Sequence, residues 1–406
     1  MHILLFNFFY KPNPDYQNMA SGLRQRGHTV WLGFRSAEGD LQWHDGEAFV
    51  GRQRGPGFVT GVVSRIPGLS HLLNRLLFLA FLFRIRGFIK QTSPQIVQLN
   101  PGSLNFPWVL KMFMPANIHF IFDIRHLNVG IRDDVVGRFR EWLLVQDYWL
   151  HARFIYNHAC FNHEHTAQLL LGKTWHKWAT VVPVGLDEQF FTIAPENGTA
   201  VSPAHPLQFI YVGAITRFRA LETIFEAAQL ARQQTDRFRI VLIGPDKTDG
   251  YYHRLVVQMG LEDLVHIKPP IPYQTVAPTM ATHDVGLAYI PDRRTWHYQP
   301  TIKVLEYRAL GLPILSIDVP SHRELVEQEV NGLLVENTVE SLAEGMIRYV
   351  IDRAFWSHCR ENALTMRKGL SICDVARMYD EAVYQKLVRY QPETDKTTTA
   401  NAAVSK

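Results

Sequence analysis

Residues 299–316 read QPTIKVLEYRALGLPILS, and the organisation of the chain follows from how this stretch folds. Pro300 and Thr301 favour the start of a helix, because proline presets φ for the first turn and a threonine hydroxyl can cap free N–H groups. Gly311 predicts the end of that helix, and Pro313 prevents its continuation. The stretch therefore predicts a loop, a short helix and a buried strand in succession.

Two charged side chains, Lys303 and Glu306, lie three residues apart on this predicted helix and project from neighbouring positions. A helix N-terminus attracts anions through its unpaired N–H groups and its dipole, so a lysine in the first turn suits a helix that receives a phosphate. A carboxylate one turn further can accept hydrogen bonds from sugar hydroxyls. A surface ion pair has the same spacing, and this stretch alone does not separate the two interpretations.

The composition is that of a soluble two-domain protein. A length of 406 residues favours two domains of roughly 150–200 residues each, and 47% hydrophobic with 20% charged residues is typical of globular chains. The net charge of +4 suits an anionic small ligand or an acidic membrane surface, but is too small to argue for nucleic acid. Three scattered cysteines, Cys160, Cys359 and Cys373, fit a reducing compartment and predict neither a zinc site nor a disulfide framework.

The N-terminal run MHILLFNFFYKPNPD predicts a buried strand rather than a signal peptide, because it lacks a basic start and a small-residue cleavage site. In the most apolar segment, 72–89, the uncharged run is too short to span a bilayer. We therefore expect a cytoplasmic protein without a transmembrane helix. Residues 65–90 combine basic and aromatic side chains, and predict either a core helix or a helix resting on an anionic membrane at its cytoplasmic face.

Strand and helix patterns alternate along the chain. An apolar run at 1–9, a helix at 16–26 and a strand at 29–34 form a βαβ unit of a parallel sheet. A second series begins with a strand at 207–213 and a helix at 219–233. Further helices are predicted at 134–157, 159–172 and 320–329. Residues 38–68 are predicted to be mostly loop, with a strand at 48–50 or 58–63.

The pattern predicts an α/β protein with two tandem Rossmann-like doubly wound domains that face each other across a cleft. Its polar stretch 194–206 predicts the linker between them. We expect an acceptor-binding domain at 1–195, a donor-binding domain at 206–370, a C-terminal helix at 371–390 that packs back towards the first domain, and a disordered tail at 391–406.

Basic residues follow the first strand of the second predicted domain. Gly213 ends that strand, and Arg217 and Arg219 stand at the mouth of the next helix. Two arginines there suit bidentate binding of a diphosphate, because ligands bind at the carboxyl ends of parallel strands. Arginines that serve only solubility would give the same sequence.

The chain resembles the family 4 glycosyltransferases of GT-B fold. The resemblance rests on GHTV (27–30), VVPVGLD (181–187), YVGAITRFRALE (211–222), DVGLAYIP (284–291), PTIKVLEYRALGLPIL (300–315) and NGLLV (331–335). It implies a sugar-nucleotide donor held by the C-terminal domain, an acceptor held by the N-terminal domain, and transfer with retention of configuration. It also implies that no metal and no other cofactor takes part, and the chain contains no Asp-x-Asp motif.

The resemblance also assigns roles to residues. Glu306 would bind the donor ribose, Lys303 and the N–H groups at 301–303 would lie against the diphosphate, and Arg219 would neutralise the leaving phosphate. The implied catalytic residues are Arg219, Lys303, Arg217 and His126. The implied donor-binding residues are Glu306, Gly213, Thr301, Ile302 and Glu324. The acceptor-side candidates are Asp123, Arg125 and Asn7.

Three positions depart from the family pattern. Tyr298 stands where a glutamate is common, Ala214 where an arginine is common, and Val184 where an asparagine is common.

The mechanism that the resemblance implies is electrostatic. Cations and a helix dipole stabilise the leaving diphosphate, and a donor phosphate oxygen takes the proton of the acceptor hydroxyl. The acceptor would be a glycan, a lipid-linked acceptor or a polyol.

Two alternatives stay open. A sugar-nucleotide epimerase of the same fold would need acid and base carboxylates and no acceptor, and a catalytically silent sugar-nucleotide-binding protein would fit the three departures. A metal at the sequence His163-Glu164-His165 is not expected, because alternate residues of a helix point apart. The glycine cluster at 51–57 lacks a strand–turn–helix context and predicts a loop.

Overall fold

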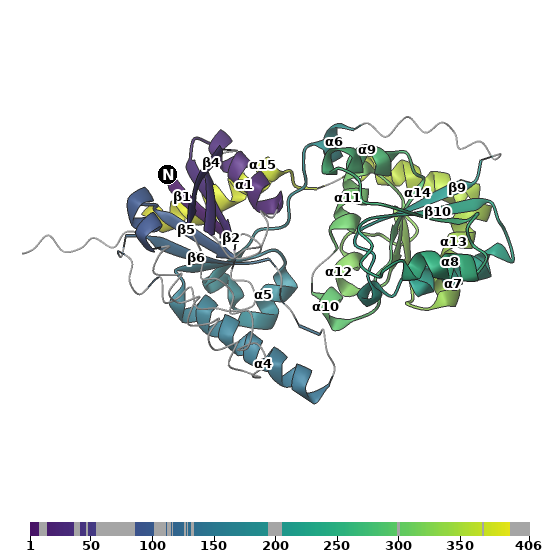
Figure 1. Ribbon diagram of the computed structural model, residues 1–406, viewed down its shortest axis with the longest axis horizontal. Coiled ribbons are helices and arrows are strands. Elements are labelled where there is room, and N and C mark those ends of the chain that lie inside the picture. Colours follow the sequence, from purple (N-terminus) through teal and green to yellow (C-terminus); the bar gives the residue numbers. More distant parts are fainter. Residues whose placement is uncertain are drawn as a thin grey trace, which may run out of the picture. The chain divides into compact units, whose positions relative to one another are not determined.

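The computed structural model describes residues 1–7, 14–35, 41–45, 48–53, 86–100, 111, 115, 117–125, 127, 129–130, 134–193, 205–298, 301–367 and 369–389. The chain forms two compact units (Figure 1). The first comprises Met1–His126, Trp142–Pro183 and Ile372–Lys406, and the second comprises Leu127–Glu141 and Val184–Ser371. Most of the predicted linker lies outside the described residues, and the facing of two domains across a cleft stays a prediction.

The first unit is built on a sheet with the strand order β4-β3-β2-β1-β5-β6-β7-β8. Six strands are parallel: β1 (His2–Asn7), β2 (Thr29–Arg35), β5 (Ile96–Asn100), β6 (His119–Ile124), β7 (His158–Phe161) and β8 (Ala179–Val181). All five residues of β5 are buried, as expected for a central parallel strand covered on both faces. The antiparallel strands β3 (Leu41–Asp45) and β4 (Ala48–Gln53) extend one edge.

The structure corrects two predictions in this unit. Residues 38–68 were predicted to be mostly loop with a strand at 48–50 or 58–63; β4 covers 48–50, whereas the antiparallel strand β3 was not predicted. The helix predicted at 159–172 is wrong in its first part, because β7 occupies His158–Phe161 and α5 (Glu164–Leu171) begins only after it. A strand of four residues shows too little alternation to be told from a helical turn, and β7 exists because it pairs with β6 and β8.

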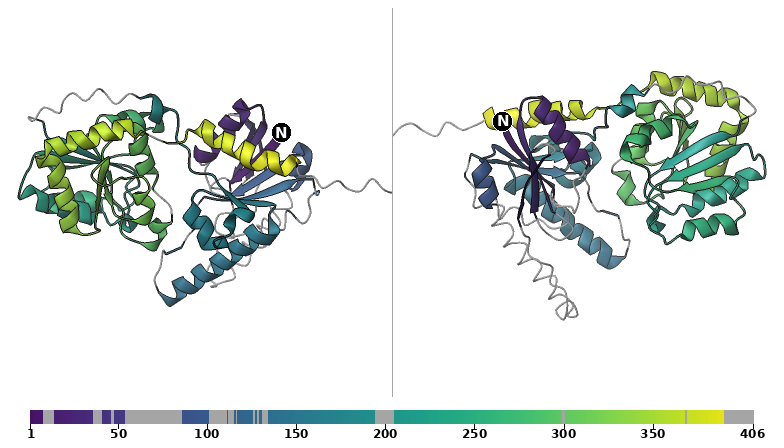
Figure 2. Two further views of the ribbon diagram at one scale, coloured as in Figure 1. Left: turned by 180° about the vertical axis from the view of Figure 1, so that it is seen from behind. Right: turned by 45° about the horizontal axis from the view of Figure 1, so that its top comes forward.

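The C-terminal segment packs on the first unit. Its helices are α15 (Ile372–Tyr379) and α16 (Gln385–Arg389), joined by the π-helical turn Asp380–Tyr384. In Figure 2 this segment, in yellow, lies beside α1 (Pro14–Gln25), in purple. The two helices touch closely, since a Cβ on Gly22 would lie 2.8 Å from the Cβ of Ala376. Arg26, just after α1, also forms a 2.9 Å ion pair with Asp380, just after α15.

The helix predicted at 134–157 is shorter than expected. The α-helix α4 spans Val135–Leu150, and the π-helical turn His151–Ile155 follows it directly. A helix also occupies residues 86–92, while the rest of the predicted helix at 65–90 lies outside the described residues. Among the helices that the structure describes, none is long and apolar enough to cross a membrane.

The second unit contains a six-stranded parallel sheet. Its strands are β9 (Leu207–Val212), β10 (Phe238–Ile243), β11 (Val265–Lys268), β12 (Val285–Ala288), β13 (Ile314–Ile317) and β14 (Gly332–Val335). The order β11-β10-β9-β12-β13-β14 is that of a Rossmann sheet, in which the direction of winding reverses between β9 and β12. Ligands of such sheets bind at the carboxyl ends of the strands beside that reversal.

Helices cover both faces of this sheet (Figure 1). On one face, α7 (Glu222–Arg232), α8 (Tyr251–Gln258), α13 (Val339–Ile351) and α14 (Arg353–Thr365) enclose the larger core. On the other, α6 (Gln189–Thr192), α9 (Val276–Ala281) and α11 (Ile302–Leu310) enclose the smaller core. Short helices α10 (Arg294–His297) and α12 (Pro320–Arg323) flank the start of α11 along the chain, and α12 is four residues long where 320–329 was predicted.

Candidate functional site

The start of α11 carries no side-chain cap. Thr301 precedes the helix in an extended conformation, but its hydroxyl makes no capping hydrogen bond, so the predicted threonine cap is wrong. The hydroxyl oxygen instead lies 3.2 Å from Nε2 of His322, whose Nδ1 lies 2.7 Å from the hydroxyl of Ser316. Since the hydroxyl is held away from the helix, the N–H groups of its first turn lack a side-chain acceptor, which is the arrangement that binds anions.

Lys303 lies buried in the first turn of α11. Only 5% of the residue is exposed, and its Nζ has no hydrogen-bond partner in the described part of the chain. The ammonium lies 3.7 Å from the centre of the Tyr211 ring on β9. Burial and the nearby charge of Arg219 hold the pKa of Lys303 well below its usual value, against the opposing attraction of Glu306. A buried cation without an acceptor is costly, so this site favours an anionic ligand.

Arg219 supplies a second, half-buried cation. It lies in the 3₁₀ turn Arg217–Arg219 that follows β9, and its guanidinium carbon lies 4.3 Å from the centre of the Trp296 ring. Its Nη1 is buried without a hydrogen-bond partner among the described residues. The structure therefore brings Arg219 and Lys303 close enough for their charges to repel each other. Two such cations at an uncapped helix start are suited to a diphosphate.

Arg217 has a different environment from Arg219. Its side chain is exposed, forms a 2.8 Å ion pair with Glu222 on α7, and stacks 3.6 Å from the centre of the Tyr251 ring. Ala220 ends the 3₁₀ turn that carries the two arginines, in a left-handed conformation with φ 45°, and α7 begins soon after it. The sequence predicted both arginines as phosphate ligands, and of the two only Arg219 is half-buried and close enough to Lys303 for their charges to interact.

Gly213 ends β9 with φ 155°, a conformation that favours glycine. Its carbonyl oxygen approaches Gly244 at the end of β10 so closely that a Cβ on Gly244 would lie 1.9 Å from it. Any side chain at Gly244 would therefore push the two strand ends apart. This close packing sets the position of the turn that carries Arg219.

Tyr307 anchors α11 to the sheet. Its hydroxyl donates to the carbonyl oxygen of Ile210 at 2.8 Å and accepts from the N–H of Val212 at 3.3 Å, both on β9. The ring packs over Gly286 of β12, where a Cβ would lie 2.4 Å from it. The positions of Tyr211, Tyr307 and Gly286 were not predicted from the sequence, because each belongs to an apolar run that reads only as core.

The remaining donor-side candidates lie around α11. Glu306 is half-buried and faces the charge of Lys303, whereas Ile302 is 43% exposed. Glu324 is exposed at the end of α12, where its carbonyl oxygen lies 3.5 Å from the guanidinium of Arg308. Their roles towards a donor stay predictions.

In the first unit, Asp123 is fully buried in a hydrogen-bond network. Its carboxylate accepts from the hydroxyl of Tyr16 at 2.6 Å, the amide of Gln98 at 2.8 Å and the hydroxyl of Tyr379 at 2.9 Å. Arg125 donates to the same carboxylate at 3.2 Å and to Tyr379 at 2.7 Å. These contacts join α1, β5, β6 and α15, and give Asp123 and Arg125 a structural role besides the predicted acceptor role.

Two other predicted residues cannot be placed in the same way. Asn7 is the last residue of β1 and pairs with Phe34 and Asn100, but its side chain lies outside the described part of the structure, as does all of His126.

The side chains of His163 and His165 do not point apart as expected. Because His163 is extended and precedes α5, the two rings stack with centres 5.0 Å apart, and their Nδ1 atoms lie 3.3 Å apart.

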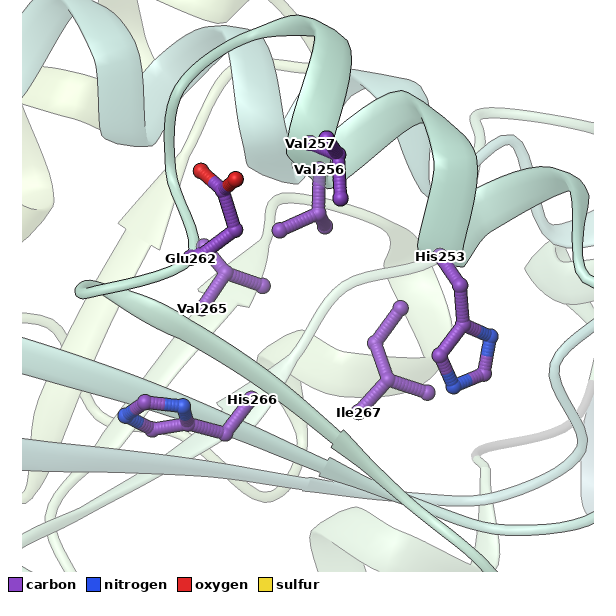
Figure 3. A pocket seen from close by; sticks show the side chains of 7 residues that line it. All are labelled: His253, Val256, Val257, Glu262, Val265, His266 and Ile267. Atoms are coloured by element: carbon purple, nitrogen blue, oxygen red, sulfur yellow. The ribbon is translucent and has the colours of Figure 1, made fainter.

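A pocket of about 270 Å³ lies elsewhere in the second unit, between α8 and the edge strand β11 (Figure 3). His253, Glu262 and His266 contribute its polar atoms, and valine and isoleucine side chains line the rest. None of the predicted donor-side residues contributes to it. The candidate site at the start of α11 is therefore separate from this pocket.

Residues 206–352 match the family model described as glycosyl transferases group 1. The match extends from the strand β9 into α13, and it includes Lys303, Glu306 and Arg219. Among curated proteins, the putative colanic acid biosynthesis glycosyltransferase WcaL of Escherichia coli K12 is 27% identical over 168 residues. That alignment covers 41% of this chain and 40% of WcaL, so the chain spans about two fifths of the length of this relative.

Two solved structures resemble nearly the whole chain. HepE of Anabaena, crystallised in complex with UDP, has a TM-score of 0.65 at 13% identity, over 94% of this chain and 99% of HepE. Sucrose-phosphate synthase of Thermosynechococcus elongatus has a TM-score of 0.68 at 17% identity, over 96% and 100% of the two chains. At these identities the likeness shows the fold. The chain has the GT-B fold. The predicted fold class is thus confirmed.

Proposed function

We propose that the protein is a glycosyltransferase that binds a nucleotide-diphosphate sugar at the start of α11 and transfers its sugar with retention of configuration. The observation that carries this proposal is a pair of cations, the buried Lys303 and the half-buried Arg219, whose buried Nζ and Nη1 atoms lack hydrogen-bond partners in the described structure. A diphosphate would supply acceptors for both. The match of residues 206–352 to glycosyl transferases group 1 supports the same activity.

In this proposal, different donor-side residues bind the phosphates and the ribose of the nucleotide sugar. The first-turn N–H groups of α11, at Ile302 and Lys303, would bind the phosphates together with Arg219. Glu306, one turn further along the helix, would accept hydrogen bonds from the ribose hydroxyls. HepE was crystallised with UDP, which makes uridine diphosphate the first nucleotide to test.

The reaction breaks the bond between the anomeric carbon and the diphosphate oxygen, and the bonding electrons leave with the diphosphate. The acceptor hydroxyl oxygen forms the new bond on the same face of the sugar, and its proton passes to a donor phosphate oxygen. Lys303 and Arg219 would stabilise the charge that develops on the leaving group, a contribution typically worth about 10²–10³ in rate. In this proposal these protein cations take the place of a metal ion.

The acceptor in this proposal is a glycan, a lipid-linked acceptor or a polyol, used in polysaccharide or glycoconjugate biosynthesis. The name of WcaL, a putative colanic acid biosynthesis glycosyltransferase, supports the polysaccharide class. The protein would act in the cytoplasm at the membrane face, with residues 65–90 in peripheral contact. Residues 65–85 lie outside the described part of the structure, so this contact rests on the sequence alone.

The test begins with calorimetric titration of UDP, GDP, ADP and their glucose conjugates into the full-length protein, followed by donor turnover with and without acceptors. We expect one nucleotide family to bind, and Lys303→Met to bind it more weakly than the parent protein does. Arg232→Ala is the matched control, because Arg232 is a cation of the same unit whose 3.0 Å partner is Asp263. Equal binding by Lys303→Met would overturn the proposed donor site.

Turnover assays separate the proposed activity from its two alternatives. Nucleotide binding without any sugar transfer or donor hydrolysis would indicate the silent sugar-nucleotide-binding protein, for which Tyr298 in place of a glutamate is the supporting feature. A change of the donor sugar's configuration in the absence of acceptor would indicate an epimerase. Sugar transfer with retained configuration would support the proposal.

A further inference from the structure

The helix α4 concentrates the exposed apolar side chains of the molecule. Eight of the twelve large hydrophobic side chains that are exposed in the described part of the chain lie between Val135 and Phe154. Val135 is 84% exposed and Phe154 60% exposed. Exposed apolar patches of this kind on a folded protein indicate a surface that binds another protein, a membrane or a ligand.

Seven of these eight side chains belong to α4 and share one face of the helix. They are Val135, Val136, Phe139, Trp142, Leu143, Trp149 and Leu150. Two series repeat every seven residues, one at 135, 142 and 149 and the other at 136, 143 and 150. At 3.6 residues per turn the seven positions fall within an arc of about 140°. The helix therefore presents an apolar stripe along its length, which only the exposed polar residue Gln146 interrupts within that arc.

Basic residues border this stripe on both sides. Arg138 and Arg140 are exposed, and the helical period places them beyond opposite edges of the arc. Asp134 and Glu141 fall on the opposite side of the helix, and Glu141 accepts from the N–H of Gly130 at 2.8 Å, whereas Asp147 borders the stripe on the same side as Arg140. The carboxylate of Asp147, at one edge, lies 3.3 Å from the ring of His151.

We propose that α4 is a membrane-docking surface that lies in the headgroup region of an anionic bilayer. Tryptophan is enriched at this depth of membranes, and Trp142 and Trp149 both lie on the stripe. Arginines at the edges of an apolar stripe can bury their aliphatic parts while their guanidinium groups reach lipid phosphates. An amphipathic helix with these features lies in the membrane interface. The inference is independent of the proposed sugar transfer.

The test is flotation of the full-length protein with vesicles of phosphatidylcholine alone or with 30% phosphatidylglycerol (about the charge density of an anionic leaflet). We expect binding to the anionic vesicles. Leu143→Glu should weaken it by about tenfold or more, and Val136→Glu with Leu143→Glu further, because each change places a charge where a side chain enters the bilayer. Matched controls are Val257→Glu on α8 and Ile351→Glu on α13, which are 60% and 59% exposed and should bind as the parent does.

An electrostatic variant and a fold check complete the experiment. Arg138→Gln and Arg140→Gln should each weaken binding by about fivefold at low salt, and added salt should remove that difference. Circular dichroism melts identify any variant that fails to fold. No binding to anionic vesicles at low salt overturns the proposal, and so does equal binding by the Leu143→Glu and Val257→Glu variants. A concentration-dependent dimer that Leu143→Glu dissolves, without vesicle binding, assigns the stripe to self-association instead.

Discussion

The ammonium nitrogen of Lys303 lies 3.7 Å from the centre of the Tyr211 ring and has no hydrogen-bond partner in the described part of the chain. The ring face partly stabilises the cation, but burial and the charge of Arg219 still lower the pKa of the amine. Burial likewise raises the pKa of Tyr211 to about 12, so the phenol stays neutral and supplies no counter-charge. A bound diphosphate can supply the counter-charge that Tyr211 does not.

We expect nucleotide-sugar binding to be coupled to proton uptake at Lys303. A bound diphosphate raises the lowered pKa of Lys303, so between the pKa values of the free and bound forms a proton enters with the ligand. Affinity then falls as pH rises through that window, by at most about tenfold per pH unit. Calorimetry in buffers of different ionisation enthalpy measures the number of protons. A nucleotide sugar is the suitable ligand, because its diphosphate is already fully ionised near neutral pH and exchanges no protons of its own there.

Lys303→Met is the control for this coupling and should take up no proton. The other groups around the amine are Arg219, Glu306 and His322, and burial and the charge of Lys303 hold the pKa of His322 at about 4. Proton uptake that persists in Lys303→Met would assign the coupling to His322 and contradict the prediction.

Without nucleotide, Lys303→Met should melt at a higher temperature than the parent protein at pH 7. The unfolded parent chain protonates this lysine more readily than the folded one does, so parent stability should rise as pH approaches the usual lysine pKa.

Arg219→Ala should lower turnover by about 10²–10³, because its guanidinium stabilises charge on the leaving diphosphate. Arg217→Ala should lower turnover by less than about tenfold, because Arg217 is an exposed side chain already paired with Glu222, and such pairs contribute little. Steady-state rates with the donor at saturation measure both. Equal losses would mean that the two arginines act together on the phosphates, as the sequence alone predicted.

Gly286→Ala should displace α11 from the sheet. The new methyl group would lie 2.4 Å from the Tyr307 ring, and overpacking of this kind typically costs about 1–3 kcal/mol of unfolding free energy. We expect lower stability in urea denaturation and weaker donor binding, with partial recovery in Gly286→Ala combined with Tyr307→Leu. Gly87→Ala is the matched control. Gly87 lies exposed in the helix at 86–92. Apart from its chain neighbours and its own helix backbone, no atom of the described residues lies within 4 Å of the place that a methyl group would take, so alanine there should be neutral or stabilising.

The fold could be predicted largely because both sheets consist of buried parallel strands separated by amphipathic helices. The helix face of Ile224, Phe225 and Ala228, for example, is visible in the sequence and is buried in α7. The strand β7 could not be predicted, because its four residues HACF carry no alternation and pair only through tertiary contacts. The hairpin of β3 and β4 lies in a segment rich in glycine and charge, whose composition predicts loop.

The candidate site was predictable in part. Lys303 and Arg219 were found because a cation at a helix start or after a strand is conspicuous in sequence. The sequence did not reveal that His322 holds the hydroxyl of Thr301 or that Trp296 covers Arg219. Those contacts join residues 21 and 77 positions apart in the chain, a separation at which a single sequence carries no pairing signal.

Asp123→Ala should destabilise the first unit rather than act on acceptor binding alone. The substitution removes the acceptor of hydrogen bonds from Tyr16, Gln98 and Tyr379 and leaves the Arg125 guanidinium buried without its carboxylate. Breaking a buried ion pair in this way typically costs about 3–5 kcal/mol. Thermal melts and urea denaturation of the full-length protein measure the loss.

Tyr379→Phe separates the structural role of this network from an acceptor role. It removes one donor to Asp123 and one acceptor of Arg125 but leaves both charges paired, so we expect a loss of only about 1–2 kcal/mol in unfolding free energy. Because Tyr379 lies on α15, the same variant should increase hydrogen exchange in the C-terminal segment at residues 372–389. Unchanged stability in Asp123→Ala, together with a raised KM for acceptor, would contradict the structural role and restore the acceptor-side assignment.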